Sequence, residues 1–133
     1  MQAHKSYVTR GIPVGAFMEP CDNSGAKVVR LFSVKGHHTR RGRIQSCGVG
    51  DLVLVSVKKG KPDVRKKVAF GVIVRQKKEY MRPDGMRLGF EDNSIVILKD
   101  DKGNPKGTLL KGPIAKEACD RWPAIAKLAS VIV

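Results

Sequence analysis

The chain has 133 residues, 41% of them hydrophobic, and its 26 Lys and Arg against 12 Asp and Glu give a formal net charge of +14. This length is typical of one domain with its own core, and this hydrophobic content argues against a disordered chain. No apolar run is long enough to span a membrane, and the polar N-terminus lacks the apolar segment of a signal peptide.

The first half of the chain predicts three strands. Residues 14–21 and 27–35 are the first two, and the turn formers at residues 22–25 are expected to join them as a hairpin. Residues 36–50 are rich in Gly and Arg and are expected to form a loop or an irregular ribbon. The third strand is predicted at residues 51–57, which are rich in Val and Leu.

A second basic loop is predicted at residues 58–67, which contain Gly60 and Pro62. The fourth strand is predicted at residues 68–75. If its side chains alternate, one face of that strand carries Phe70, Val72 and Val74.

A hairpin and a fifth strand follow. Within residues 80–90, the dipeptide Asp84-Gly85 is a strong hairpin signal. Residues 94–99 are the predicted fifth strand, and residues 100–106 form a polar turn.

Helical spacing begins only after Pro113. Apolar residues then recur four, four, three and four positions apart, at Ile114, Ala118, Trp122, Ile125 and Ala129. Pro123 is expected to start a second short helix, because its missing N–H costs nothing at the first helical position. We therefore predict two short helices that pack one apolar stripe on the sheet, with Trp122 as the anchor.

These elements predict a mainly β fold: a small five-stranded barrel with a hairpin and two short C-terminal α-helices. Five strands without strand–helix–strand alternation favour a closed barrel, because closure removes exposed strand edges. A single domain is expected over residues 1–133. It comprises a polar lead-in at 1–13, the barrel with its basic loops and hairpin at 14–99, and the turn and short-helix region at 100–133.

The positive charge is concentrated in one part of the chain. Residues 27–87 hold 17 of the 26 Lys and Arg but only 4 of the 12 Asp and Glu, so this segment carries +13 (17 − 4) of the +14. A segregated charge repels itself and indicates that a polyanion compensates it. The alternative for any one charged loop is a solvated surface without a partner.

Two basic loops, residues 35–43 and 58–67, flank the third strand, so we expect them to project from neighbouring positions on the barrel. Arg suits phosphate because its planar fork makes two parallel hydrogen bonds. Aromatic residues are only 5% of the chain, which argues against a base-stacking platform and favours folded RNA or a duplex. The candidate RNA-binding residues are Lys35, Arg40, Arg41, Arg43, Lys58, Lys59, Lys61, Arg65, Lys66, Lys67, Arg75, Lys77, Lys78, Arg82 and Arg87.

Neither a metal site nor a cofactor is expected. His37, His38 and Cys47 could ligate a metal, but a fourth ligand is missing and the spacing fits no familiar site. The two histidines fit better as further donors to RNA. Cys21, Cys47 and Cys119 are far apart and odd in number, which predicts reduced, buried thiols in a cytosolic protein.

No catalytic motif is recognisable, so an enzyme is not expected. The paired acids Asp100-Asp101 and Glu91-Asp92 are adjacent in the sequence and would point apart within a strand or turn. They are assigned to turns and surface, with Asp92 and Asn93 expected to cap a turn through side-chain hydrogen bonds to backbone.

Several motifs together resemble the universal large-subunit ribosomal protein L-fourteen family. The stretch from Gly71 to Leu98 matches the family's signature, and the resemblance extends from about residue 14 to the end. The matching segments are 22–26 (DNSGA), 55–60 (VSVKKG), 71–75 (GVIVR), 82–85 (RPDG), 90–93 (FEDN), 96–98 (VIL), 107–108 (GT) and 112–117 (GPIAKE). The longer N-terminus and the segment at 119–123 (CDRWP) resemble the archaeal and eukaryotic branch of the family. The sequence as a whole resembles archaeal members.

The resemblance implies a five-stranded barrel with a β-ribbon and two short C-terminal helices, in a structural protein of the cytoplasmic ribosome. It implies binding to large-subunit rRNA and an intersubunit bridge to small-subunit rRNA. It also implies two protein neighbours, the third large-subunit ribosomal protein and an L24e-type protein. Factors that block subunit joining are expected to dock on the C-terminal region.

One position departs from the bacterial pattern of the family. Bacterial members tend to have an Arg after Gly-Thr, whereas this chain has Leu109, so an Arg contact there does not carry over. The residues expected to face the other subunit or a factor are Lys106, Thr108, Lys111 and Lys116. The rival functions are a free-standing RNA-binding barrel, such as a chaperone or translation factor, and an RNA-processing enzyme.

Overall fold

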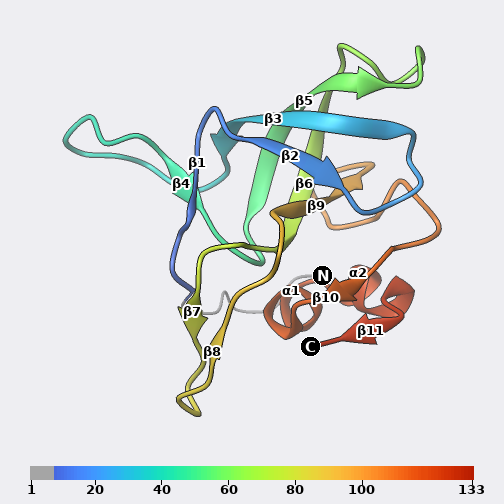
Figure 1. The fold of residues 1–133 in the computed structure, drawn as a ribbon. Coiled ribbons are helices and arrows are strands. Elements are labelled where there is room, and N and C mark those ends of the chain that lie inside the picture. The colour runs from blue at the N-terminus through green and yellow to red at the C-terminus, as the bar shows by residue number, and fades with distance from the viewer. Residues whose placement is uncertain (1–7) are drawn as a thin grey trace.

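A closed barrel of five strands forms the centre of the molecule (Figure 1). The computed structural model describes residues 8–133; the predictions for residues 1–7 of the lead-in lie outside this range. The strands, in their order around the barrel, are β2 (Phe17–Pro20), β3 (Ala26–Val34), β5 (Leu52–Gly60), β6 (Val68–Arg75) and β9 (Ser94–Leu98). The predicted five-stranded barrel is therefore confirmed.

Neighbouring barrel strands are antiparallel except at the closure, where β2 and β9 run parallel. That closure consists of two residue pairs, Glu19 with Ser94 and Pro20 with Ile95. The buried carboxylate of Asp22 strengthens the same junction, because it accepts hydrogen bonds from the Ile97 N–H at 3.0 Å and the Ser24 hydroxyl at 2.8 Å.

Three pairs of two-residue strands surround the barrel. The predicted hairpin is confirmed: β7 (Tyr80–Met81) pairs antiparallel with β8 (Arg87–Leu88), and Gly85 supplies the positive φ of +90° that its turn requires. The other two pairs were not predicted. They are β1 (Ile12–Pro13) with β4 (Ser46–Cys47), and β10 (Pro113–Ile114) with β11 (Val131–Ile132).

The C-terminal region forms two short helices, α1 (Lys116–Arg121) and α2 (Pro123–Leu128), as predicted. Pro123 occupies the start of α2, which confirms its expected role. Of the predicted helical stripe, Ala118 and Ile125 lie in the helices, and Trp122 and Ala129 are cap residues. Ile114 lies elsewhere, in β10, where it pairs with Ile132. Ile114 is buried, as the stripe predicted, but as part of a strand pair and not of a helix.

Apolar side chains fill two regions. One is the barrel interior, where Val29, Leu31 and Val53 are fully buried. The other lies between the outer face of β6 and β9 and the C-terminal region, and it includes the predicted strand face of Phe70, Val72 and Val74. All three cysteines are buried, as predicted.

Trp122 joins the helices to the barrel, as predicted. Its side chain is 1% exposed and belongs to the second apolar region. Its indole N–H donates to the carbonyl oxygen of Gly50 at 2.9 Å. Within residues 8–133, none of the helices combines the length and hydrophobicity that crossing a membrane would take.

Candidate nucleic-acid interface

The first basic group lies on the loop between β3 and β4. A surface pocket there is lined by His37, His38, Thr39, Arg40, Arg41 and Arg43, so the structure brings the three predicted arginines together. All three arginines are exposed. The base of the loop is held by Gln45, whose side chain accepts a hydrogen bond from the Val34 N–H and donates to the His37 carbonyl oxygen at 2.6 Å.

The second basic group begins on β5 and continues into the turn before β6. Strand β5 runs to Gly60, so Lys58 and Lys59 are strand residues rather than the loop residues that the sequence predicted. Backbone hydrogen bonds between Val57 and residues 66–67 close the turn, and Val64 is buried beneath it. The exposed cations of this group are Lys58, Lys59, Lys61, Arg65, Lys66 and Lys67.

The two basic groups lie at opposite ends of β5, and the expectation of neighbouring positions is wrong (Figure 1). A strand of nine residues at about 3.3 Å per residue separates its ends by about 30 Å. Loops that precede and follow one strand must project from its two ends. The cations therefore form two separate surfaces on a rigid barrel.

Arg75 and Arg82 are directed at protein acceptors. Arg75 pairs with Asp92 at 3.0 Å and donates to the carbonyl oxygens of Lys111 and Pro113. Its side chain is 11% exposed. These contacts connect β6 to the segment that leads into β10, so the structure gives Arg75 a role in positioning the C-terminal region.

Arg82 connects the hairpin to the C-terminal region in a similar way. Its Nε lies 2.8 Å from the Glu117 carboxylate, and its Nη2 donates to the Val133 carbonyl oxygen at 2.6 Å. Tyr80 donates its hydroxyl to the same carboxylate at 2.9 Å. Burial and the adjacent carboxylate raise the pKa of Tyr80 well above its usual range, so the hydroxyl stays a donor.

The remaining predicted cations are on the surface. Lys35 pairs with Asp101 at 2.8 Å and lies over the Phe70 ring, and Arg87 lies 4.0 Å from Glu79. Lys77 and Lys78 are exposed on the segment leading into the hairpin.

The residues predicted to face the other subunit fall on two segments. Lys106, Thr108 and Lys111 lie on the loop before β10, whereas Lys116 begins α1. Sequence reasoning missed Asn23, which fixes this loop: its side-chain oxygen accepts from the Thr108 N–H at 2.8 Å, and its amide donates to the Thr108 hydroxyl. The only signal for it was the turn motif at residues 22–25.

Asn93 makes the expected kind of side-chain hydrogen bond to backbone, but to a distant segment and not as a turn cap, and the turn cap expected at Asp92 is wrong. Asn93 accepts a hydrogen bond from the backbone N–H of Lys77 at 2.8 Å, and Asp92 pairs with Arg75. Arg75 is the last residue of β6, and Lys77 follows shortly after it. The segment that enters β9 runs beside this part of the chain, so Asp92 and Asn93 bond to it. In the part of the chain from residue 8 onward, no three His, Cys, Asp or Glu side chains group as a metal site would require.

A model of the family described as ribosomal protein L14p/L23e matches residues 11–133. The chain belongs to the ribosomal protein L14p/L23e family. The large ribosomal subunit protein uL14 of Nanoarchaeum equitans is 51% identical over 133 residues, which cover 100% of both chains. The protein of the same name from Thermoplasma acidophilum is 49% identical over 125 residues, which cover 94% of each.

These relatives confirm the resemblance seen in the sequence. Both are archaeal, in agreement with the resemblance of the sequence to archaeal members. The stretch from Gly71 to Leu98, which carries the resemblance to the family, also gains a structural explanation. It contains Arg75, Arg82 and Asp92, which hold the hairpin and the C-terminal region against the barrel. Part of the motif therefore maintains the shape of the molecule.

A pH-dependent contribution to stability is expected from Glu117. Burial alone would raise its pKa, but hydrogen bonds from Arg82 and Tyr80 hold the pKa below its usual 4.5. A lowered folded-state pKa stabilises the protein above the unfolded-state value and is lost as pH falls through the folded-state value. We expect Glu117→Gln to lower the free energy of unfolding by about 2–3 kcal/mol at pH 7, since Arg82 loses its anion.

Denaturant unfolding across pH 3–7 measures this contribution. The difference between the wild type and Glu117→Gln should shrink as pH falls below about 4.5. The matched control is Glu79→Gln, whose exposed carboxylate lies 4.0 Å from Arg87 and should change stability by less than about 0.5 kcal/mol. A difference that stays constant with pH would contradict the assignment.

Proposed function

We propose that this protein is a structural constituent of the large ribosomal subunit that binds large-subunit rRNA. The observation that carries the proposal is the display of the basic segment as exposed cations at both ends of β5. The matched relatives are named large ribosomal subunit proteins, which supports the same place for this chain. The role is structural rather than catalytic.

Binding is through phosphate and the shape of folded RNA. Separate basic surfaces about 30 Å apart (nine residues of β5) can hold two RNA segments at a fixed distance. Arg75 and Arg82 are committed to protein acceptors and are left out of the proposed contact set. That set is Lys35, Arg40, Arg41, Arg43, Lys58, Lys59, Lys61, Arg65, Lys66, Lys67, Lys77, Lys78 and Arg87.

The C-terminal part of the chain is proposed to meet proteins and the small subunit. The Asn23-anchored loop presents Lys106 and Lys111 for a bridge to small-subunit rRNA. The helices and β11 would face ribosomal protein neighbours, among them the third large-subunit protein and an L24e-type protein. A factor that blocks subunit joining would use the same region.

Sedimentation of cell extract tests the assignment to the large subunit. An epitope-tagged copy is expected in the large-subunit and whole-ribosome fractions of a sucrose gradient. Recovery only at the top of the gradient would contradict this assignment and favour a free-standing RNA-binding barrel.

The bridge is tested with the same gradients. Subunits that carry Lys106→Ala together with Lys111→Ala should associate with small subunits several-fold less well at limiting Mg²⁺, because two phosphate contacts are lost. Lys99→Ala with Lys127→Ala removes the same charge elsewhere and is the control. Equal association of the two double variants would rule out a bridge at this loop.

A further inference from the structure

Two exposed aromatic side chains lie on the outer surface of the barrel and take no part in the RNA contacts proposed above. The chain has four Phe, and of these Phe17 is 63% exposed on β2 and Phe32 is 43% exposed on β3. A single exposed apolar side chain is common on a protein surface, whereas several on one face indicate a binding site. The strand register decides whether these two share a face.

The register gathers both side chains on one outer face of the barrel. Phe17 lies opposite Arg30 between β2 and β3. Arg30 lies opposite Ser56 between β3 and β5, and Ser56 lies opposite Val68 between β5 and β6. Opposite residues on adjacent strands point to the same side of a sheet, and Phe32 follows Arg30 on β3 with one buried residue between them. We call these five residues the platform; its row across four strands is about 14 Å long, at about 4.8 Å between strands.

Arg30 lies next to both Phe residues of the platform and is free to bind an anion. Among residues 8–133, its side chain has no hydrogen-bond or ion-pair partner. The guanidinium extends toward Gly15, where its Nη2 would lie 3.9 Å from an added Cβ, and glycine has no side chain to cover it. A planar, unpaired guanidinium beside aromatic rings suits both the phosphate and the base of a nucleotide.

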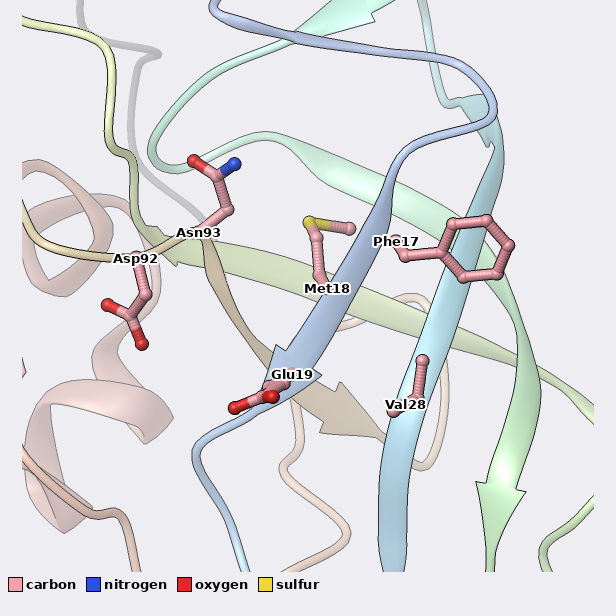
Figure 2. A pocket seen from close by; sticks show the side chains of 6 residues that line it. All are labelled: Phe17, Met18, Glu19, Val28, Asp92 and Asn93. Atoms are coloured by element: carbon pink, nitrogen blue, oxygen red, sulfur yellow. The ribbon is translucent and has the colours of Figure 1, made fainter.

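The acids beside the platform leave little negative charge. A pocket adjoins the platform at β2, and Figure 2 shows Phe17 at this pocket with its ring extending over β3. Two acids, Glu19 and Asp92, line the same pocket. Asp92 pairs with Arg75 at 3.0 Å, so within the described part of the chain only Glu19 is left without a side-chain partner.

Cations outnumber that one acid. Lys59 lies opposite Val28, which lines the same pocket, and Arg30 lies on the platform itself. Lys59 also belongs to the second basic group, three residues after Ser56 of the platform on β5. The platform therefore continues a surface that is proposed to contact RNA, and its charge favours an anionic partner with flat apolar groups.

We propose that the platform binds unpaired nucleotides of RNA, whose bases pack on Phe17 and Phe32 and whose phosphates pair with Arg30. This inference rests on the proposed rRNA binding and deepens it, because it adds a single-stranded element to the contacts with folded RNA. Every base has a π-face, so aromatic rings bind unpaired bases with little regard to sequence. The low aromatic content of the chain argued against a stacking platform, but the fold exposes two of the four Phe on one face.

Fluorescence anisotropy with two labelled RNA hexamers tests the proposal on the full chain. One hexamer is the single strand r(CAACAA), and the other has the same sugar–phosphate backbone without bases. Both have the same phosphates, so the ratio of their affinities measures base stacking alone. We expect the wild type to bind the intact hexamer about tenfold more tightly, and Phe17→Ala or Phe32→Ala to reduce that ratio to about threefold or less.

The role of Arg30 is measured by the salt dependence of the same binding. Arg30→Ala should weaken both hexamers to a similar extent. It should also make the slope of log affinity against log salt shallower by about 0.7, the contribution of one phosphate contact on a single strand. NMR of the isotope-labelled chain locates the contact, and the shifts caused by the intact hexamer should include the amides of residues 17, 30, 32 and 56.

Two matched variants separate the platform from general attraction. Met86→Ala removes an apolar side chain that is 59% exposed between β7 and β8, and it should leave the ratio of affinities within twofold of the wild type. Lys127→Ala removes one exposed positive charge from α2 and should leave the salt slope unchanged. Retained spectra verify that every variant is folded.

Three results would overturn the proposal: equal affinity for the two hexamers, a ratio that Phe17→Ala and Phe32→Ala leave unchanged, or shifts that leave out the platform amides. Tighter binding of a glutamate-rich peptide at the same amides would also overturn it and assign the platform to a protein partner. Binding of large-subunit rRNA transcripts by the wild type, measured in parallel, reports on the proposed function by itself. If the transcripts bind and the two hexamers bind equally, only this inference fails.

Discussion

Replacing Trp122 with alanine is expected to lower the free energy of unfolding by about 3–5 kcal/mol. The indole is 1% exposed, and the space it occupies is closed by Gly103, where even a Cβ would lie 2.5 Å from the ring. The cavity left behind cannot be filled by the neighbouring backbone. A loss of this size is a large share of the 5–15 kcal/mol typical of a domain.

Urea unfolding measures the loss. It is followed by circular dichroism, because the substitution removes the chain's one Trp and with it the tryptophan fluorescence signal. Trp122→Phe keeps most of the packing and loses the hydrogen bond to Gly50, so it should cost only about 1–2 kcal/mol. Gly50 retains a second donor, Arg121 at 2.9 Å. The exposed Phe32→Ala is the control, and a Trp122→Ala effect as small as that of the control would contradict the anchoring role.

Replacing Arg40, Arg41 and Arg43 together with alanine is expected to weaken rRNA binding by roughly a hundredfold at about 50 mM salt. The three side chains are exposed and line one pocket, so they can contact adjacent phosphates. Each phosphate contact contributes about 0.9 to the slope of log affinity against log salt. The slope should therefore become shallower by about 2–3.

Mobility shifts in rising salt, with domain-sized transcripts of large-subunit rRNA, give this slope. The control is the triple variant of Lys99, Lys102 and Lys127, which removes three exposed cations outside the basic segment. If the control changes the slope as much as the arginine variant does, binding depends on net charge and the assigned loop is not a specific contact.

The barrel strands were predictable because their patterns are local. The limits of β6 match the predicted residues 68–75, and β3 begins one residue earlier than predicted. Asp84-Gly85 and Pro123 were also reliable, since each imposes a backbone conformation on its own.

Two of the three pairs of two-residue strands were not predictable. In β1–β4 and β10–β11, too few residues alternate to give a periodic signal, and their partners lie far along the chain. Ile114 illustrates the effect: it fits a helical stripe by spacing, yet the pair with Ile132 decides its conformation.

For the candidate interface, residue type predicted where positive charge occurs in the chain, but not whether each side chain contacts solvent or a protein carboxylate. Arg75 and Arg82 have the same sequence context as their exposed neighbours, and only the fold reveals that Asp92 and Glu117 lie within reach. The separation of the two basic groups follows from the length of β5, which the sequence predicted as seven residues (51–57) and the structure extends to nine.

The closure of the barrel also constrains when the protein can fold. Glu19 pairs next to Ser94, 75 residues later in the chain, and Trp122 reaches back 72 residues to Gly50. During synthesis, β2, β3 and the basic segment emerge long before their last partners exist. We expect folding to be late and slow, on the order of milliseconds to seconds. Until then, unpaired strands of the nascent chain, with +13 of charge in residues 27–87, remain exposed to solvent and to other chains.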